Sequence, residues 1–267
     1  MKKFFLLSFI GLFLLSSVTS QGFSQTAKDI LEKMITAQGG REKMESIKDS
    51  SISGTILVMI PQNMSGPITI YWNNPNKSRV DVEIMGMKFI QATDGKIAWM
   101  DNPMGGGLQD MPEQRSKGFK RNSLGHAVLL NPEKYGITYV LKGKEKIDNH
   151  DYYLLERSYP DGHKTTLFVD SKTYLVFKTK SKSPGPQGGE VDRETLLSDY
   201  KKIEGTQVAH TLNTSIGGQD YTKITFKEVK YNSGLKDSMF DKPKVEKPKE
   251  EKPKEEEKTK KEEKSNK

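Results

Sequence analysis

The 267-residue sequence contains no cysteine. Without thiols the chain can form neither disulfide bonds nor thiolate metal sites, and it has no cysteine nucleophile. A bacterial lipoprotein anchor is excluded as well, because that anchor requires a cysteine at the signal-peptide cleavage site. We therefore expect a mature chain without a covalent lipid anchor.

The sequence also lacks the motifs of catalytic sites. Its four histidines are far apart, and none belongs to an HExxH or similar metal-ligand spacing: His126, His150, His163 and His210. There is no GxSxG motif, no phosphate-binding loop and no GxGxxG after a strand. The sequence therefore predicts no catalytic residue, no metal ion, no cofactor and no enzymatic activity, although groups assembled only by the fold are not visible in sequence spacing.

The positive charge of the chain gives no argument for a nucleic-acid partner. The formal charge of +8 includes Lys2, Lys3 and the stretch from residue 242 to 267, where eleven Lys against eight Glu leave about +3. Only about +3 then remains on the rest of the chain. We expect no binding of nucleic acid.

Both ends of the sequence differ in composition from its middle. Residues 1–20 combine two lysines, an apolar run and small residues before the next position, which is typical of a secretory signal peptide. A retained membrane anchor is the alternative. Residues 242–267 consist mostly of Lys, Glu and Pro and should be disordered, as a solvated spacer or as a contact with an anionic membrane surface or cell wall. One folded domain is predicted over residues 21–241.

Five apolar runs separated by short turn signals occupy residues 51–103. Connections this short force neighbouring strands to pair antiparallel, which predicts a meander. Side-chain alternation places apolar residues on one face and mainly polar ones on the other. The residues predicted to line an apolar cavity are Ile56, Val58, Ile68, Ile70, Trp72, Val80, Val82, Ile84, Phe89 and Trp99. A core packed solid, without a cavity, is the alternative.

Methionines gather at one end of this meander. Met is flexible and polarizable, so a group of them suits a variable apolar partner, although Met as a gap filler in the core is the alternative for each position. A helix is predicted over residues 26–40, lying across the concave side of the sheet. The Gly-rich stretch 102–135 is interpreted as a lid, with a disordered insertion as the alternative. The predicted rim and lid residues are Met59, Met64, Met85, Met87, Met100, Met104, Leu31 and Met34.

The second half of the chain returns to strand-like runs rich in β-branched and aromatic residues, from residue 137 to 232. Together with the first half this gives about eleven strands, and so many antiparallel strands in one sheet must curl. The predicted fold is mainly β with flanking α: an incomplete antiparallel β-barrel whose concave face is covered by helices.

Several passages resemble the LolA/LolB lipoprotein-carrier superfamily. DGKIAWMDNP, residues Asp94–Pro103, is similar to the DGK-x-x-W-x-x-NP signature of that superfamily, and it follows a W-x-x-P passage at Trp72–Pro75. LFVDSKTYLVFKTKSK, SDYKKIEG and FKEVKYNSGLKDSMFDKP resemble the C-terminal half of the branch known as outer membrane lipoprotein-sorting proteins. The resemblance extends over residues 26–243. Two positions depart from it: Asn74 replaces an arginine that helps hold the lid shut in LolA, and Ala209 replaces a proline.

The resemblance implies an eleven-stranded incomplete barrel, lidded by helices, whose cavity takes the acyl chains of lipoproteins in the periplasm of Gram-negative bacteria. From it we expect a soluble, monomeric, LolA-like periplasmic carrier that is not membrane-integral after signal removal. Its expected partners are a lipoprotein or other acylated ligand, with sorting components of the inner and outer membranes. The alternative is a non-catalytic envelope interaction module of the same fold with a filled cavity.

Overall fold

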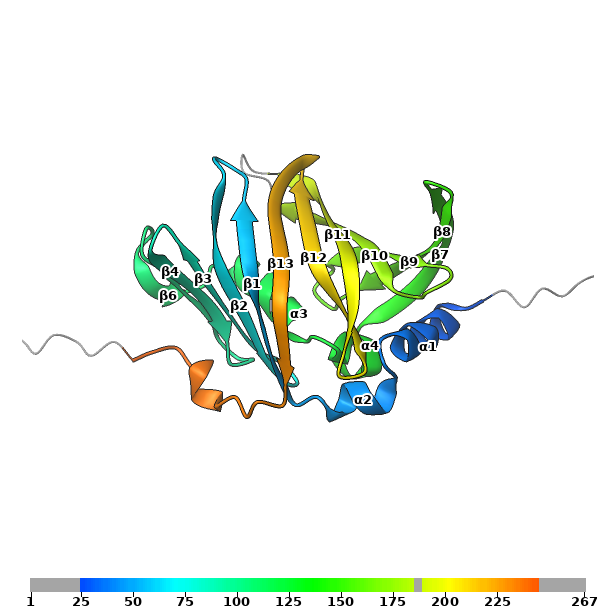
Figure 1. Ribbon diagram of the computed structural model, residues 1–267, viewed down its shortest axis with the longest axis horizontal. Helices are drawn as coiled ribbons and strands as arrows, with labels where there is room; N and C mark the ends of the chain where they lie inside the picture. Colours follow the sequence, from blue (N-terminus) through cyan, green and yellow to red (C-terminus); the bar gives the residue numbers. More distant parts are fainter. Residues whose placement is uncertain (1–24, 185–188, 245–267) are drawn as a thin grey trace, which may run out of the picture.

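Thirteen strands form one antiparallel sheet in the computed structural model, which describes residues 25–184 and 189–244 (Figure 1). The first half of the chain supplies β1 (Asp49–Val58), β2 (Met64–Asn73), β3 (Lys77–Ile84), β4 (Met87–Thr93), β5 (Ala98–Asn102) and β6 (Gly107–Asp110). The second half supplies β7 (Thr138–Ile147), β8 (His150–Ser158), β9 (Lys164–Asp170), β10 (Val176–Pro184), β11 (Glu190–Ile203), β12 (Thr206–Ile216) and β13 (Gln219–Tyr231).

The sheet consists of two meanders that meet at their first and last strands. Its order is β6-β5-β4-β3-β2-β1-β13-β12-β11-β10-β9-β8-β7, so each strand lies beside its sequence neighbour except at the pairing of β1 with β13. β6 and β7 are the two edges, and the sheet is not closed into a barrel. The predicted fold class, mainly β with an incomplete antiparallel barrel, is therefore confirmed.

The sheet has more strands than the roughly eleven expected, and β6 lies in the stretch predicted to be irregular. Gly107 to Asp110 pair with Asn102 to Trp99 of β5. Glycine and aspartate are depleted in strands, and the GLQD run contains no β-branched or aromatic residue. The pairing with β5 thus determines this strand, rather than its own sequence.

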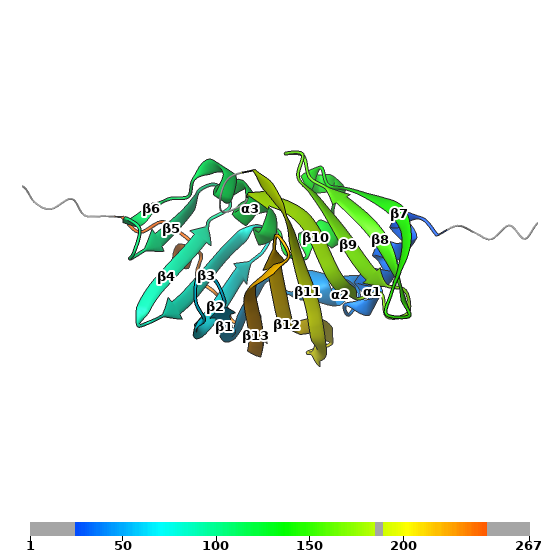
Figure 2. The same ribbon diagram turned by 90° about the horizontal axis from the view of Figure 1, so that it is seen from above.

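The helices lie mainly on the concave face of the curved sheet (Figures 1 and 2). They are α1 (Ala27–Ala37), α2 (Arg41–Ser46), α3 (Glu113–Ser123) and α4 (Ala127–Leu130), with short 3-10 helices η1 (Glu133–Tyr135) and η2 (Asp237–Met239). Ile30 and Met34 of α1 pack against Tyr153, Leu155 and Leu167 of β8 and β9. α1 therefore covers the second meander, as predicted for a helix with a broad apolar face.

α1 begins and ends where the sequence predicts. The hydroxyl of Thr26 accepts a hydrogen bond from the backbone N–H of Asp29, and the Asp29 carboxylate accepts one from the backbone N–H of Thr26, which forms a capping box. Gly39 follows the helix with φ +118°, and a Cβ there would lie 2.6 Å from the carbonyl oxygen of Gly205. Only glycine therefore fits where the chain passes the β11–β12 turn.

The convex face of the first meander is covered by the C-terminal end of the described chain. Ala92 pairs with both Arg79 and Trp99, so these side chains share the face opposite to Val80. The Trp99 Nε1 donates to the carbonyl oxygen of Phe240 at 2.8 Å, and Arg79 Nη1 donates to that of Met239 at 3.0 Å. Trp99 therefore does not line the concave cavity as predicted; it holds the C-terminal segment against the outside of the sheet.

Both chain ends with unusual composition fall almost wholly outside the described residues. The predicted signal peptide, residues 1–20, lies outside them, and so does the predicted tail apart from residues 242–244, among which Lys242 pairs with Asp110 at 2.9 Å. Both assignments stay predictions. Within the described ranges, no helix is both long enough and apolar enough to cross a membrane.

Candidate functional site

A cavity of about 340 Å³ lies between the concave face of the sheet and its helical cover. Its walls come from β1, β2 and β8–β13, and its cover from α1 and from residues 125–129 around the start of α4. Most of the lining is aliphatic or aromatic: Met34, Ile47, Ile52, Trp72, Val128, Leu129, Leu167, Val176, Leu197, Val208, Leu212 and Phe226. This half of the sheet therefore has a cavity in place of the solidly packed core that was the alternative.

Only two of the residues predicted for the site, Trp72 and Met34, line this cavity. Other residues of the predicted apolar face share the face of Trp72, since Ile52 pairs with Ile70, and Ile70 with Val80. They continue the apolar surface beyond the enclosed volume: Ile56 and Ile68 are buried, and the others are half-buried, namely Val58, Ile70, Val80, Val82, Ile84 and Phe89. Their contact with a ligand stays a prediction.

Most methionines of the predicted rim lie at one end of the sheet, but not at the cavity. Met59, Met64, Met85, Met87 and Met104 belong to or adjoin the β1–β2, β3–β4 and β5–β6 turns, which an antiparallel meander places at the same end. The cavity, in contrast, is lined at the start of β1 and the end of β2. These five methionines therefore do not line the cavity.

Two further residues of the predicted rim and lid are buried. Met100 is 9% exposed and packs with Ala98 and Met111 beneath Phe119 of α3, so it is a core residue. Met34 is fully buried, and Leu31 is partly buried in the same cluster. α1 is thus a packed cover of the cavity.

The stretch predicted to be a lid does lie over the concave face. It contains α3 and α4, and Gly125, His126, Val128 and Leu129 from it line the cavity. Several polar contacts tie this stretch to the rest of the fold, among them three that involve α3 or α4. The Tyr139 hydroxyl donates to the carbonyl oxygen of Val128 at 2.9 Å, Arg41 Nη1 donates to that of Leu130 at 2.8 Å, and Arg121 forms an ion pair with Asp161.

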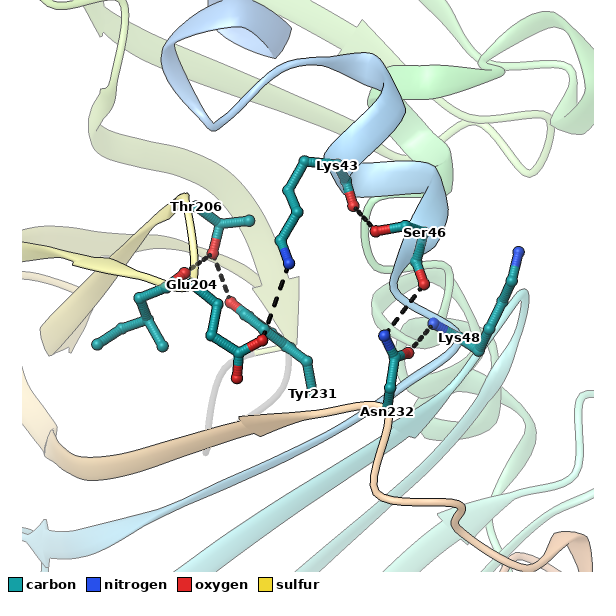
Figure 3. A network of polar contacts seen from close by, with 8 residues as sticks. Lys43, Ser46, Lys48, Glu204, Thr206, Tyr231 and Asn232 are labelled. Atoms are coloured by element: carbon teal, nitrogen blue, oxygen red, sulfur yellow. Dashed lines mark hydrogen bonds and ion pairs between the residues drawn. The ribbon is translucent and has the colours of Figure 1, made fainter.

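A polar network links α2 to the β11–β12 turn and to the residue that follows β13 (Figure 3). Lys43 of α2 faces Glu204 of the β11–β12 turn at 3.8 Å, and Asn232 Nδ2 donates to the carbonyl oxygen of Ser46 at 3.2 Å. The hydroxyls of Thr206 and Tyr231 are 2.7 Å apart. Since Tyr231 lines the cavity, this network holds one wall in place.

Burial shifts the pKa values of several polar groups in or beside the site in favour of their uncharged forms. Desolvation lowers the pKa of His126 below its ordinary value, and it raises the pKa of Tyr139 to about 12. Burial also raises the pKa of Tyr200, whose hydroxyl donates to the carbonyl oxygen of Val176 at 2.7 Å. The charged groups of the lining are then Asp49 and Arg157.

The low pKa of His126 predicts a pH dependence of stability. The unfolded chain binds this proton near pH 6.5, before the folded chain does, so unfolding should become easier as the pH falls from 6.5 toward the lower folded pKa. Above pH 6.5 the contribution is constant. Urea unfolding at pH 7.5 and pH 5.5 should show a smaller loss of stability for His126→Asn than for the wild type. Equal losses in both proteins would contradict this assignment.

Sequence reasoning missed most of this site because the cavity is built mainly from the second meander. One local signal was present. In DYYLLERS, the residues Tyr153, Leu155 and Arg157 alternate on one face of β8, so a cation follows two apolar residues on a buried face. The sequence around Leu197 and Leu212 contains no comparable pattern that would indicate a cavity. Within residues 25–184 and 189–244, no three His, Asp or Glu side chains are grouped as metal ligands.

Three crystal structures share this fold over almost their whole length. A LolA superfamily protein from Nitrosomonas europaea matches with a TM-score of 0.57 at 15% identity, covering 82% of this chain and 99% of that one. A DUF1329 family protein from Desulfovibrio piger matches with a TM-score of 0.57 at 14% identity, covering 82% and 98%. A domain described as a candidate outer membrane lipoprotein-sorting protein from Vibrio parahaemolyticus matches with a TM-score of 0.56 at 16% identity, covering 81% and 96%.

Identities this low show a common fold and no more. At that level the predicted LolA-like resemblance is confirmed. A sequence-family model described as "Uncharacterized protein" matches residues 131–247. No curated protein matches the sequence.

Proposed function

We propose that this chain, whose fold is that of LolA-like proteins, is a non-catalytic carrier of the bacterial envelope. It binds the acyl chain of a lipoprotein or of another lipid in the cavity and carries it toward the outer membrane. The signal-peptide pattern of residues 1–20 supports export into the periplasm of a Gram-negative bacterium. An acylated ligand and sorting components of the two membranes are the proposed partners of the monomer.

The single observation that carries this proposal is the apolar cavity beneath the helices. Its volume of about 340 Å³ is at the lower end of the range of small-molecule sites, about 300–1,000 Å³. Burying about eight methylenes at about 0.8 kcal/mol each would contribute about 6 kcal/mol before the costs of association. The half-buried aliphatic residues of β2 and β3 could shield a longer chain outside the enclosed volume.

The cover is compatible with uptake and release. The segment from α3 to α4 is joined to the rest of the fold by polar contacts, among them Tyr139 with Val128 and Arg41 with Leu130, and by the apolar packing of Val128 and Leu130. A neutral hydrogen bond contributes only about 0.5–1.5 kcal/mol to stability. Displacing this segment would break these contacts but keep the ladder hydrogen bonds of the sheet, so it should cost less than unfolding the sheet, as a carrier that must release its ligand needs.

The proposal is tested by filling the cavity. Leu197 of β11 lines it, so Leu197→Trp places a large ring in the volume that the acyl chain would occupy. We expect the affinity for a tripalmitoylated peptide or for methyl palmitate to fall at least tenfold. Native mass spectrometry after incubation with each ligand measures the bound fraction.

The neighbouring residue of the same strand provides the matched control. Leu196 lies on the opposite face and is 39% exposed, so Leu196→Trp adds the same ring outside the cavity and should leave binding unchanged. If the wild-type protein takes up neither ligand, the carrier proposal is wrong. Equal binding by both tryptophan variants would show that the ligand lies elsewhere.

A further inference from the structure

Arg157 is a half-buried cation without a counter-ion in the cavity wall. It lies near the end of β8 and lines the cavity. Among the described residues no carboxylate comes within 4.0 Å of its guanidinium, and its buried Nε has no hydrogen-bond partner. The neighbouring carboxylates are paired elsewhere, Glu156 with Lys164 at 3.2 Å and Asp161 with Arg121.

A second buried donor in the same cavity is also unpaired. Trp72 Nε1, from β2 in the other meander, has no hydrogen-bond partner in the described part of the chain. Several other polar groups of the lining do have partners. Asp49 accepts from the backbone N–H groups of Ser233 and Gly234 at 2.7 and 3.0 Å, and the Tyr200 hydroxyl donates to a backbone carbonyl. The unpaired groups are thus two donors, which call for an acceptor.

Arg157 also lies beside the Tyr139 hydroxyl, which is a neutral partner, and its Nε still has no acceptor among the described residues. The guanidinium lies over the ring of Tyr159, 5.2 Å from the ring centre, which stabilises a cation through one face. The in-plane N–H donors point away from such a contact and need oxygen acceptors. Since arginine stays protonated in proteins, it cannot lose its charge on burial, and a partly buried unpaired cation is costly.

We propose that the cavity takes an anionic amphiphile, whose carboxylate or phosphate group accepts hydrogen bonds from Arg157. This inference rests on the proposed function and narrows its ligand class. The planar guanidinium matches both oxyanions in a two-point contact, and such charge-assisted bonds are shorter and stronger than neutral ones. The apolar chain then lies along Leu197, Leu212 and Phe226, which line the same cavity. A neutral acyl ester offers Arg157 only weaker acceptors.

The test compares acid with ester in the full-length protein. Wild-type protein should bind palmitate and hexadecyl phosphate at least about tenfold more tightly than methyl palmitate, as expected for a hydrogen bond to a charged group. Arg157→Met keeps the length of the side chain and removes its charge, so the affinity for both anions should fall about tenfold while that for the ester stays within about twofold. Whichever anion binds more tightly identifies the headgroup class.

Two further variants separate a headgroup contact from a general charge or folding effect. Lys178→Met removes a cation that lies over another aromatic ring, 4.1 Å from the centre of Phe168, but Lys178 does not line the cavity, so anion binding should persist. Arg157→Lys keeps the charge without the planar fork and should bind the anions with intermediate affinity. Retained ester binding shows that a variant is folded.

The outcomes distinguish this inference from the carrier proposal. Equal wild-type affinities for palmitate and methyl palmitate would overturn the anionic headgroup while leaving an acyl-chain carrier intact. Anion binding unaffected by Arg157→Met would likewise overturn it. If no ligand of either kind binds, both proposals fall.

Discussion

Replacing Phe240 by alanine is expected to lower the free energy of unfolding by about 3–5 kcal/mol, the usual cost of deleting a fully buried aromatic ring. Phe240 has no exposed surface, and its carbonyl oxygen accepts the hydrogen bond from Trp99 Nε1. The other contacts of the segment around η2 are polar and partly exposed, such as those of Asp237 with Asn73 at 2.9 Å and with Lys77 at 2.7 Å. Loss of the ring should therefore release this segment and expose Trp99, which is 1% exposed in the native fold.

Urea unfolding followed by tryptophan fluorescence measures this effect. The control is Met239→Ala, because Met239 contributes a backbone carbonyl to Arg79, which the substitution keeps. We expect that variant to lose less than about 1 kcal/mol. A loss below about 1 kcal/mol for Phe240→Ala as well would mean that the C-terminal segment does not pack on the sheet in solution.

Gly54→Ala is expected to disrupt the seam between the two meanders and to cost about 3 kcal/mol or more. The register of β1 against β13 shifts between Ser53 and Gly54, and a Cβ at Gly54 would lie 2.1 Å from the carbonyl oxygen of Thr225. The atom it meets belongs to the backbone, so no side-chain rotation can relieve the overlap. β1 and β13 must separate locally, which breaks ladder hydrogen bonds.

Gly118→Ala is the control, because the same substitution at this position should raise stability. Gly118 is within α3, and a Cβ there would meet only the end of the Arg121 side chain at 3.6 Å. Gly118→Ala should raise stability by up to about 1 kcal/mol through better helix propensity. Thermal unfolding of both variants, with hydrogen exchange of β1 and β13 amides, checks the prediction. Normal protection of these amides in Gly54→Ala would contradict it.

The sequence predicted the first meander well wherever one face of a strand is covered. In β1 to β3, apolar and polar residues alternate because only the concave side is apolar, so the face of Ile70 and Val80 could be assigned correctly. β5 has helix α3 on one side and the C-terminal segment on the other. Both faces of β5 are therefore apolar, alternation disappears, and Trp99 was assigned to the wrong face.

The DGK passage shows how a motif can be structural. Asp94 Oδ1 accepts hydrogen bonds from the backbone N–H groups of Lys96 and Ile97, both at 2.7 Å, which forms the tight turn between β4 and β5. Gly95 takes φ +93° at the same turn. The tryptophan five residues after Asp94 then anchors the chain terminus. The motif thus forms a turn and packs the convex face of the first meander, and none of its residues lines the cavity.

The position of the cavity could not be predicted because it depends on pairing between distant segments. Local patterns give strands and turns, but they do not say which edge of one meander meets which edge of the other. Once β1 lies beside β13, Trp72 and Phe226 face the same volume, and Arg157 joins them from β8. The alternation of Arg157 with two apolar residues was the available clue, but its role required the complete sheet.

The seam between β1 and β13 also has a consequence for how the chain is made. The first meander is synthesised with a long unpaired strand at its border, and the partner of that strand, residues 219–231, is almost the last folded segment to emerge. Until then its amide and carbonyl groups are open to pairing with other chains. Pairing of the first strand in the sequence with the last is a contact of high sequence separation, which makes this folding step slow. We therefore expect the incomplete chain to need protection from aggregation until β13 has been synthesised.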